Sequence, residues 1–204
     1  MTAAAQKPSK ERLLDAAIHL FRARGYTATR VDDICENAGL TKGSFFHHFS
    51  SKEDLALASI RHWEGLNSAA SDSTLYRFLP DPVDRLLGYV DFRKTLLRGE
   101  LPDYTSLTGT LLQEIYLTHP MLRQVCDESI SEEAAFLEAD IASAIRLRGL
   151  QISWTAASLA LHIEAVIQGA FILAKAKDGP AVAVACLDHL HRFLELLFTA
   201  RQPA

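Results

Sequence analysis

Apolar residues recur at intervals of three and four along nearly the whole chain, and no useful stretch alternates as a strand would. The first such segment starts at Ser9, which can cap a helix, and stops at Gly25, where a left-handed residue can end it. Later segments are expected to be helical over 83–99, 104–118, 120–148, 153–177 and 180–199, and Pro82, Pro102, Pro120 and Pro180 lie near the starts of four of them. The pattern predicts an all-α protein.

Two short helices with a tight turn between them are predicted within residues 31–50. Thr29 is expected to cap the first, which ends at Gly39, and the second runs from Thr41 to about Phe49. Ser51 then caps a fourth helix that continues to about residue 68. This order of elements is typical of a helix-turn-helix.

A helix-turn-helix needs a small residue where its helices cross, a residue tolerant of positive φ in its turn, and an apolar inner face. Cys35 and Gly39 meet the first two demands. We therefore interpret Cys35 as a packing residue in preference to a redox switch. The inner face is expected to hold Ile34, Ala38, Leu40, Phe45 and Phe49.

Residues 69–82 form a looser connection, so the chain divides there into a head and a body. The head is a helix-turn-helix domain over 9–55, with the fourth helix as a connector to 68, and the body is a helical domain over 69–204. Residues 1–63 hold nine Lys and Arg against seven Asp and Glu, and the remainder holds twelve against eighteen. A slightly basic head on an acidic body fits contact of the head alone with phosphate.

Several other classes of protein are not favoured. The three cysteines show no disulfide or zinc spacing, and the sequence contains no glycine-rich nucleotide loop, metalloprotease motif or nucleophile elbow. We expect no enzyme activity, metal or cofactor. A signal peptide is not expected, and the apolar stretch 154–174 contains His162, Glu164 and Gln168, which favours a core helix of a cytoplasmic protein over a membrane span.

The head resembles the tetracycline-repressor (TetR) family. The resemblance lies in Thr29, Val31–Ile34, Ala38–Ser44, Phe45–Phe49 and Ser51–Leu55, and it extends from about residue 9 to 60. It implies that the second short helix enters the major groove of an operator. The family commonly has tyrosine where this chain has Phe46, so a hydroxyl for phosphate is missing and Phe46 is not among the expected contacts.

The implied DNA contacts are phosphate or base-edge contacts around the second short helix. Phe45 could touch a thymine methyl, and Gly43 would allow close approach to the duplex. A metal site at His47 and His48 is not favoured, because adjacent helical residues diverge by about 100°. The full set is Thr29, Arg30, Thr41, Lys42, Gly43, Ser44, Phe45, His47, His48 and Lys52.

Two heads must lie about one helical turn of DNA apart to bind a palindrome, so the body is expected to form a homodimer. The last two helices are the candidates, and the alternative is that they only fill the core of one subunit. Apolar residues recur there at Leu159, Leu161, Val166, Ile167, Phe171, Leu173, Ala183, Leu187, Leu190, Leu194 and Leu197. Polar and aromatic side chains on apolar helices are the candidate effector contacts, namely Tyr89, Phe92, Gln113, Tyr116, His162 and Gln168.

Together these features predict a transcriptional repressor that binds double-stranded DNA as a homodimer and is released by a small-molecule effector. The alternatives are an activator or architectural protein with the same head, or an all-α redox sensor, metal sensor or enzyme.

Overall fold

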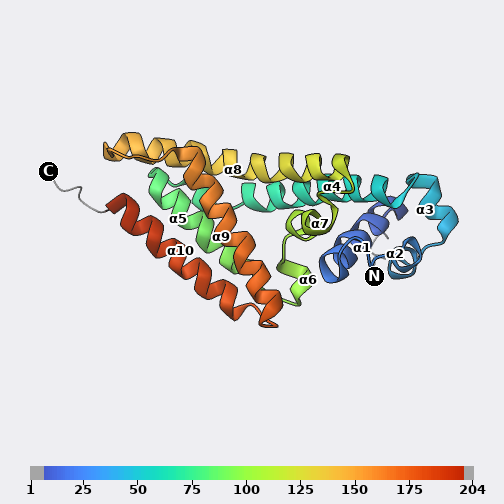
Figure 1. Ribbon diagram of the computed structural model, residues 1–204. Helices are drawn as coiled ribbons and strands as arrows, with labels where there is room; N and C mark the ends of the chain where they lie inside the picture. The colour runs from blue at the N-terminus through green and yellow to red at the C-terminus, as the bar shows by residue number, and fades with distance from the viewer. Residues whose placement is uncertain (1–6, 200–204) are drawn as a thin grey trace, which may run out of the picture. The chain divides into compact units, whose positions relative to one another are not determined.

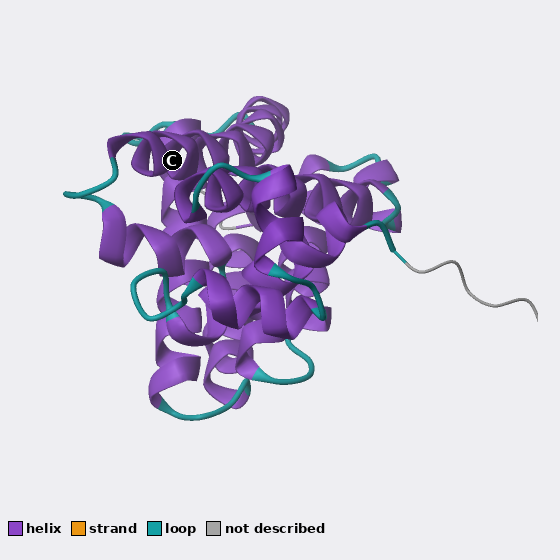
Figure 2. Cartoon of the chain, turned by 90° about the vertical axis from the view of Figure 1, so that its right-hand side faces the viewer, coloured by secondary structure: helices purple, strands orange, loops and turns teal. Residues whose placement is uncertain are grey.

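The computed structural model describes residues 7–199, and these residues form helices and loops without a strand (Figure 2). The all-α prediction is confirmed. The elements are α1 (Ser9–Arg24), α2 (Val31–Ala38), α3 (Lys42–His48), α4 (Lys52–Asp72), the 3-10 helix η1 (Leu75–Phe78), α5 (Pro82–Thr95), α6 (Leu101–Tyr104), α7 (Leu107–Ile115), α8 (Pro120–Arg148), α9 (Ala156–Ala176) and α10 (Ala181–Thr199).

The expected helix boundaries differ from the observed ones where a side chain caps the helix. Asp81 accepts a hydrogen bond from the Val83 amide, so α5 starts with Pro82 in its first turn. Ser106 accepts from the Gly109 amide, which starts α7 three residues later than predicted. Two short elements, η1 and α6, were not predicted from the pattern at all.

The chain forms two compact units whose boundary differs from the predicted division. Unit 1 comprises the residues up to Ser68 together with Thr105–Asp127, and unit 2 comprises Ala69–Tyr104 together with the residues from Glu128 onward. The prediction placed residues 105–127 in the body at 69–204, but they belong to unit 1 together with the head. The reason is packing, since Leu107, Leu111 and Ile115 are buried in the core of unit 1. The last five residues of the predicted body lie outside the described range.

In unit 1, helix α1 packs against α2, α3 and α7 (Figure 1). Its buried face supplies Leu13, Ala17 and Phe21 to a core shared with Ile34 and Phe45. Gly25 ends α1 with φ +83°, as predicted from the sequence.

In unit 2, helix α10 packs against both α9 and α5 (Figure 1). Helix α9 is long and apolar enough to cross a membrane by length and composition, but Ile163, Ile167 and Phe171 are buried in the unit's core. The interpretation of α9 as a core helix agrees with this packing.

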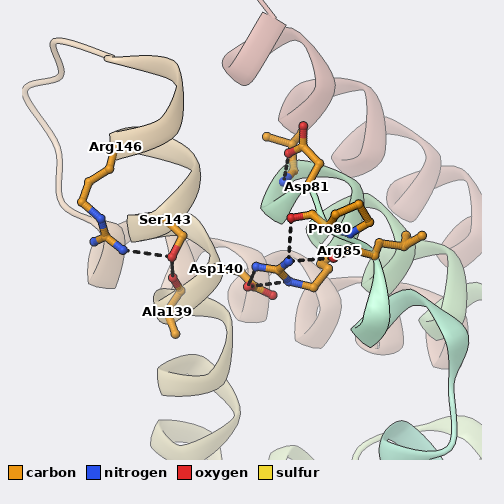
Figure 3. Close-up of polar contacts among 9 residues, drawn as sticks. Pro80, Asp81, Arg85, Ala139, Asp140, Ser143 and Arg146 are labelled. Carbon is orange, nitrogen blue, oxygen red and sulfur yellow. Dashed lines mark hydrogen bonds and ion pairs between the residues drawn. The ribbon is translucent and has the colours of Figure 1, made fainter.

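A polar cluster joins α5 to α8 within unit 2 (Figure 3). Arg85 donates from Nε and Nη2 to one carboxylate oxygen of Asp140, at 2.8 and 2.6 Å, and from Nη1 to the Leu79 and Pro80 carbonyls. Asp81 accepts from Arg148 through its second oxygen at 2.5 Å. These contacts fix the start of α5 on α8.

Candidate nucleic-acid interface

The turn between α2 and α3 has the geometry that the sequence predicts. Gly39 adopts φ 62° and ψ 40°, its amide bonds the Glu36 carbonyl at 3.0 Å, and the Leu40 amide bonds the Cys35 carbonyl at 2.8 Å. These hydrogen bonds satisfy carbonyls that the end of α2 would leave unpaired.

Arg12 of α1 supports the same turn from outside. Its guanidinium donates to the carbonyls of Ala38 at 2.5 Å and Gly39 at 3.3 Å. A Cβ atom at Gly39 would lie 2.9 Å from this guanidinium, which is the flexible end of its side chain, so the glycine is needed for its left-handed φ. Sequence reasoning missed Arg12, because its partners lie 26 and 27 residues away.

Helix α3 starts where Thr41 caps it. The Thr41 backbone is extended, and its hydroxyl accepts a hydrogen bond from the Ser44 amide at 3.2 Å. Lys42 and Gly43 follow on the exposed surface, and Ser44 is half-buried. Lys42 pairs with exposed Asp32 at 2.8 Å, and a contact of this kind contributes little to stability.

The two faces of α3 differ sharply. Phe45 and Phe49 lie one turn apart in the core, with 0% and 3% of their surface exposed, whereas 58% of Phe46 is exposed. The ring of Phe46 meets that of Phe45 edge-on at 5.1 Å between centroids. Phe45 is therefore a core residue and the prediction that it touches DNA is wrong, while Phe46, which was left out, lies on the open face.

Glycine at position 43 is not required by the fold. A Cβ atom there would meet only Thr41 Oγ1, at an ordinary 3.6 Å. Gly43 leaves the backbone of α3 bare at this exposed point, which gives space for the close approach of a duplex.

Thr29 and Lys52, two of the predicted phosphate contacts, both bind the loop between α1 and α2. Thr29 is fully buried and its hydroxyl donates to the Gly25 carbonyl at 2.7 Å, so it is neither the cap of α2 nor a DNA contact. Lys52 donates to the carbonyls of Tyr26 and Thr29 at 2.9 and 3.0 Å, and its ammonium lies 4.1 Å from the Tyr26 ring centroid. Burial lowers the pKa of Lys52, with nearby Glu114 opposing the shift.

The remaining candidates divide between solvent and neighbouring side chains. Arg30 is exposed and pairs with Asp33 at 3.0 Å, and its own amide bonds the same carboxylate, which caps α2. His47 is exposed, but His48 turns towards α1, where its Nε2 lies 2.6 Å from Ser9 Oγ. Of the predicted contacts, Arg30, Thr41, Lys42, Gly43 and His47 are thus exposed and Ser44, His48 and Lys52 are half-buried, and Phe46 is exposed beside them.

The six effector candidates do not lie in one unit. Gln113 and Tyr116 belong to unit 1 and are exposed, and His162 is exposed on α9 beside the ring of Phe193. Tyr89 is buried in unit 2, where its hydroxyl donates to Glu164 Oε1 at 3.1 Å. Phe92 and Gln168 are half-buried in the same unit. Glu164 was not among the predicted effector contacts. Its position in the middle of the most apolar helix could have indicated it, because a carboxylate is rare in such a place.

The apolar residues predicted to form a dimer also divide into two groups. Most of the recurring leucines on α10, including Leu187, Leu190 and Leu194, are buried within unit 2 and so fill its own core. Leu161 and Leu173 of the predicted set are exposed on α9, and so are Ile172 of α9 and Phe193 and Leu196 of α10.

Comparison with known proteins places this geometry in a class. Residues 13–59 match the family model of bacterial regulatory proteins, tetR family. The chain is 38% identical over 58 residues to the uncharacterized regulator YerO of Bacillus subtilis, with 28% of this chain and 20% of that protein covered. It is 32% identical over 122 residues to the repressor KstR2 of Rhodococcus jostii, with 52% and 60% covered.

The two curated relatives are thus matched over less than two thirds of their own length. The structure is also similar to a TetR transcriptional regulator from Chloroflexus aurantiacus, with 25% identity, a TM-score of 0.78, and coverage of 92% of this chain and 94% of that one. The fold and the exposed second helix are similar to those of helix-turn-helix transcriptional regulators. The likeness to the tetR family model is confined to the head, residues 13–59, and the rest of the chain is similar to TetR regulators in fold. The relatives and the solved structure named above are all described as regulators or repressors.

Proposed function

We propose that this protein is a cytoplasmic transcriptional repressor that binds a palindromic operator as a homodimer and is released by a small molecule. The observation that supports this best is the open face of α3, where Lys42, Gly43 and Phe46 are exposed while Phe45 locks the helix to the core. A helix held by one face and bare on the other is suited to the major groove.

Phosphate contact falls to the exposed cations in this proposal. Arg30 and Lys42 flank the open face, and their present carboxylate partners, Asp33 and Asp32, are solvent-accessible ion pairs. Exposed pairs of this kind are weak, so phosphate can replace them at little cost. Phe46 would contribute an apolar contact to a thymine methyl or sugar, and Ser44 a hydrogen bond to a base edge.

Dimerisation would use the exposed apolar residues of α9 and α10. Exposed apolar side chains that lie together often mark an interaction surface. Two copies related by a twofold axis would pack α9 and α10 of each subunit together as a four-helix contact. Sedimentation should show a dimer for the native chain. Phe193→Glu should produce monomers, whereas Leu75→Glu, at an exposed residue of unit 2 outside this face, should not.

Selection of binding sites from a random duplex library with the full chain tests the proposal. Recovery of a palindrome with half-sites about one helical turn apart is expected. Failure to retain any duplex at low salt would contradict DNA binding, and an unpaired half-site would contradict the dimer. A reporter carrying the recovered site should fall in output when the protein is present, and a rise would identify an activator.

A further inference from the structure

An incompletely paired carboxylate lies in the core of unit 2. Glu164 is 2% exposed, and its Oε1 accepts the hydrogen bond from Tyr89 of α5. Its Oε2 is also buried and has no hydrogen-bond partner within the described part of the chain. Buried polar atoms are nearly always paired, so an exception of this kind needs an explanation.

The neighbouring cation does not provide the missing partner. Arg93, one turn after Tyr89, donates to Glu133 Oε1 of α8 at 2.6 Å. This side chain is 14% exposed and that of Glu133 is 37% exposed, so the pair lies towards the rim of the core. Two carboxylates thus share one guanidinium, and the bond goes to Glu133.

The charge balance affects the protonation of Glu164. Burial raises its pKa to about 7, the negative charge of Glu133 adds to the rise, and Arg93 and the Tyr89 hydrogen bond oppose it. Near neutral pH the protonated and ionised forms of the Glu164 carboxyl group are consequently both populated. The ionised form needs a cation to compensate its buried charge.

Aromatic side chains surround this part of unit 2. The ring of Tyr76 meets those of Tyr89 and Phe92, at 6.3 and 5.8 Å between centroids. The Arg93 guanidinium already lies over the rings of Tyr89 and Phe171, at 5.8 and 5.9 Å. Aromatic faces attract cations, especially where water is excluded.

We propose that unit 2 binds an organic ammonium ion, which pairs with Glu164 Oε2 and packs against the aromatic side chains beside it. This names the chemical class of the effector, and it rests on the proposed function only for the effect on DNA. The ammonium supplies both the positive charge and the N–H donor that Oε2 lacks. Because Oε2 is closed to solvent, binding displaces surrounding side chains, so the ligand favours a second arrangement of unit 2.

The test compares 2-phenylethylammonium with its uncharged analogue 2-phenylethanol, by calorimetry on the full chain at pH 8. The native protein should bind the ammonium at least tenfold more tightly than the alcohol. Glu164→Gln keeps the shape and removes the charge, and the preference should fall below twofold. Glu138→Gln, an exposed carboxylate on α8, is the matched control and should retain the preference. No preference in the native protein, or an unchanged one in Glu164→Gln, overturns the proposal.

A measurement on the native chain covers the case in which Glu164→Gln does not fold. Lowering the pH from 8 to 5.5 leaves the probe charged but protonates Glu164, so ammonium affinity should drop at least fivefold, and a flat profile overturns the proposal. Operator binding, measured by anisotropy, is a separate readout. Operator binding without an ammonium preference ends this inference alone, whereas an ammonium preference without operator binding contradicts the proposed function alone.

Discussion

The helix-turn-helix of unit 1 and the polar core of unit 2 are built in opposite ways. In the helix-turn-helix, Gly39 and Thr41 act on neighbours within four residues, and the open face of α3 follows from local geometry. In unit 2, Tyr89 and Glu164 meet across 75 residues, and Arg93 and Glu133 across 40. The open face of α3 is thus set by residues that are close in the sequence, whereas the buried site of unit 2 is assembled from segments that are far apart in it.

The strongest test of this comparison is to replace each of two adjacent phenylalanines of α3 with alanine. Phe45→Ala removes a fully buried ring and should lower the free energy of unfolding by about 3–5 kcal/mol. Phe46→Ala should change stability by less than about 0.5 kcal/mol and weaken operator binding about tenfold. Chemical denaturation and fluorescence anisotropy measure the two effects. Equal destabilisation by both substitutions would contradict the two-faced description of α3.

The second test concerns the buried carboxylate of unit 2. The pKa of Glu164 is raised in the folded chain, so between about pH 5 and 7 the folded state binds more protons than the unfolded state. The stability associated with this group is therefore present at low pH and lost as pH rises through about 7. Glu164→Gln should remove this loss and gain on the order of 1–3 kcal/mol over the native chain at pH 8.

Urea denaturation between pH 5 and 8 measures this difference. The gain of Glu164→Gln should shrink towards zero at the acid end, and Glu138→Gln should follow the native profile throughout. A gain that does not vary with pH would show that Glu164 is not the titrating group.

The third test separates two lysines of unit 1. Lys52→Met keeps the apolar stem but removes two hydrogen bonds to loop carbonyls, and should cost about 1–2 kcal/mol of stability. Lys42→Met should leave stability nearly unchanged and reduce the salt dependence of operator binding by about 0.9 in log–log slope. If Lys52→Met instead lowers the slope and spares stability, its ammonium is a phosphate contact after all.

The fourth test concerns Gly43, where the expected change in stability is smaller than at Phe45, Glu164 or Lys52. Alanine there fits the fold and should stabilise α3 by about 0.5–1 kcal/mol, yet it should weaken operator binding severalfold by keeping the duplex away. Gly65→Ala is the matched control, because a Cβ atom at Gly65 of α4 meets nothing within 4 Å. It should show the gain in stability without the loss of DNA affinity.

The sequence predicts features whose cause is local. The left-handed stops at Gly25 and Gly39 and the cap at Thr41 were all predicted, since each depends on a few neighbouring residues. The direction of single side chains was not predicted reliably. Phe45, Thr29 and Lys52 match the family pattern, but packing turns the first two inwards and loop carbonyls hold the third.

Long-range packing explains the other errors. Residues 105–127 were assigned to the body because they follow the linker in the chain, yet their apolar side chains are buried with those of α1. Glu164 was not predicted as an effector contact, since nothing near it in sequence indicates Tyr89 as its partner.

The discontinuous make-up of unit 1 affects how a minimal DNA-binding fragment can be cut. A fragment that ends at Ser68 contains the whole helix-turn-helix but loses Leu107, Leu111, Ile115 and Leu122, all buried against it. Such a fragment would expose this apolar surface to solvent, so we expect it to aggregate or unfold during expression. Grafting this head onto another regulator therefore requires transplanting α7 and the first turns of α8 along with it.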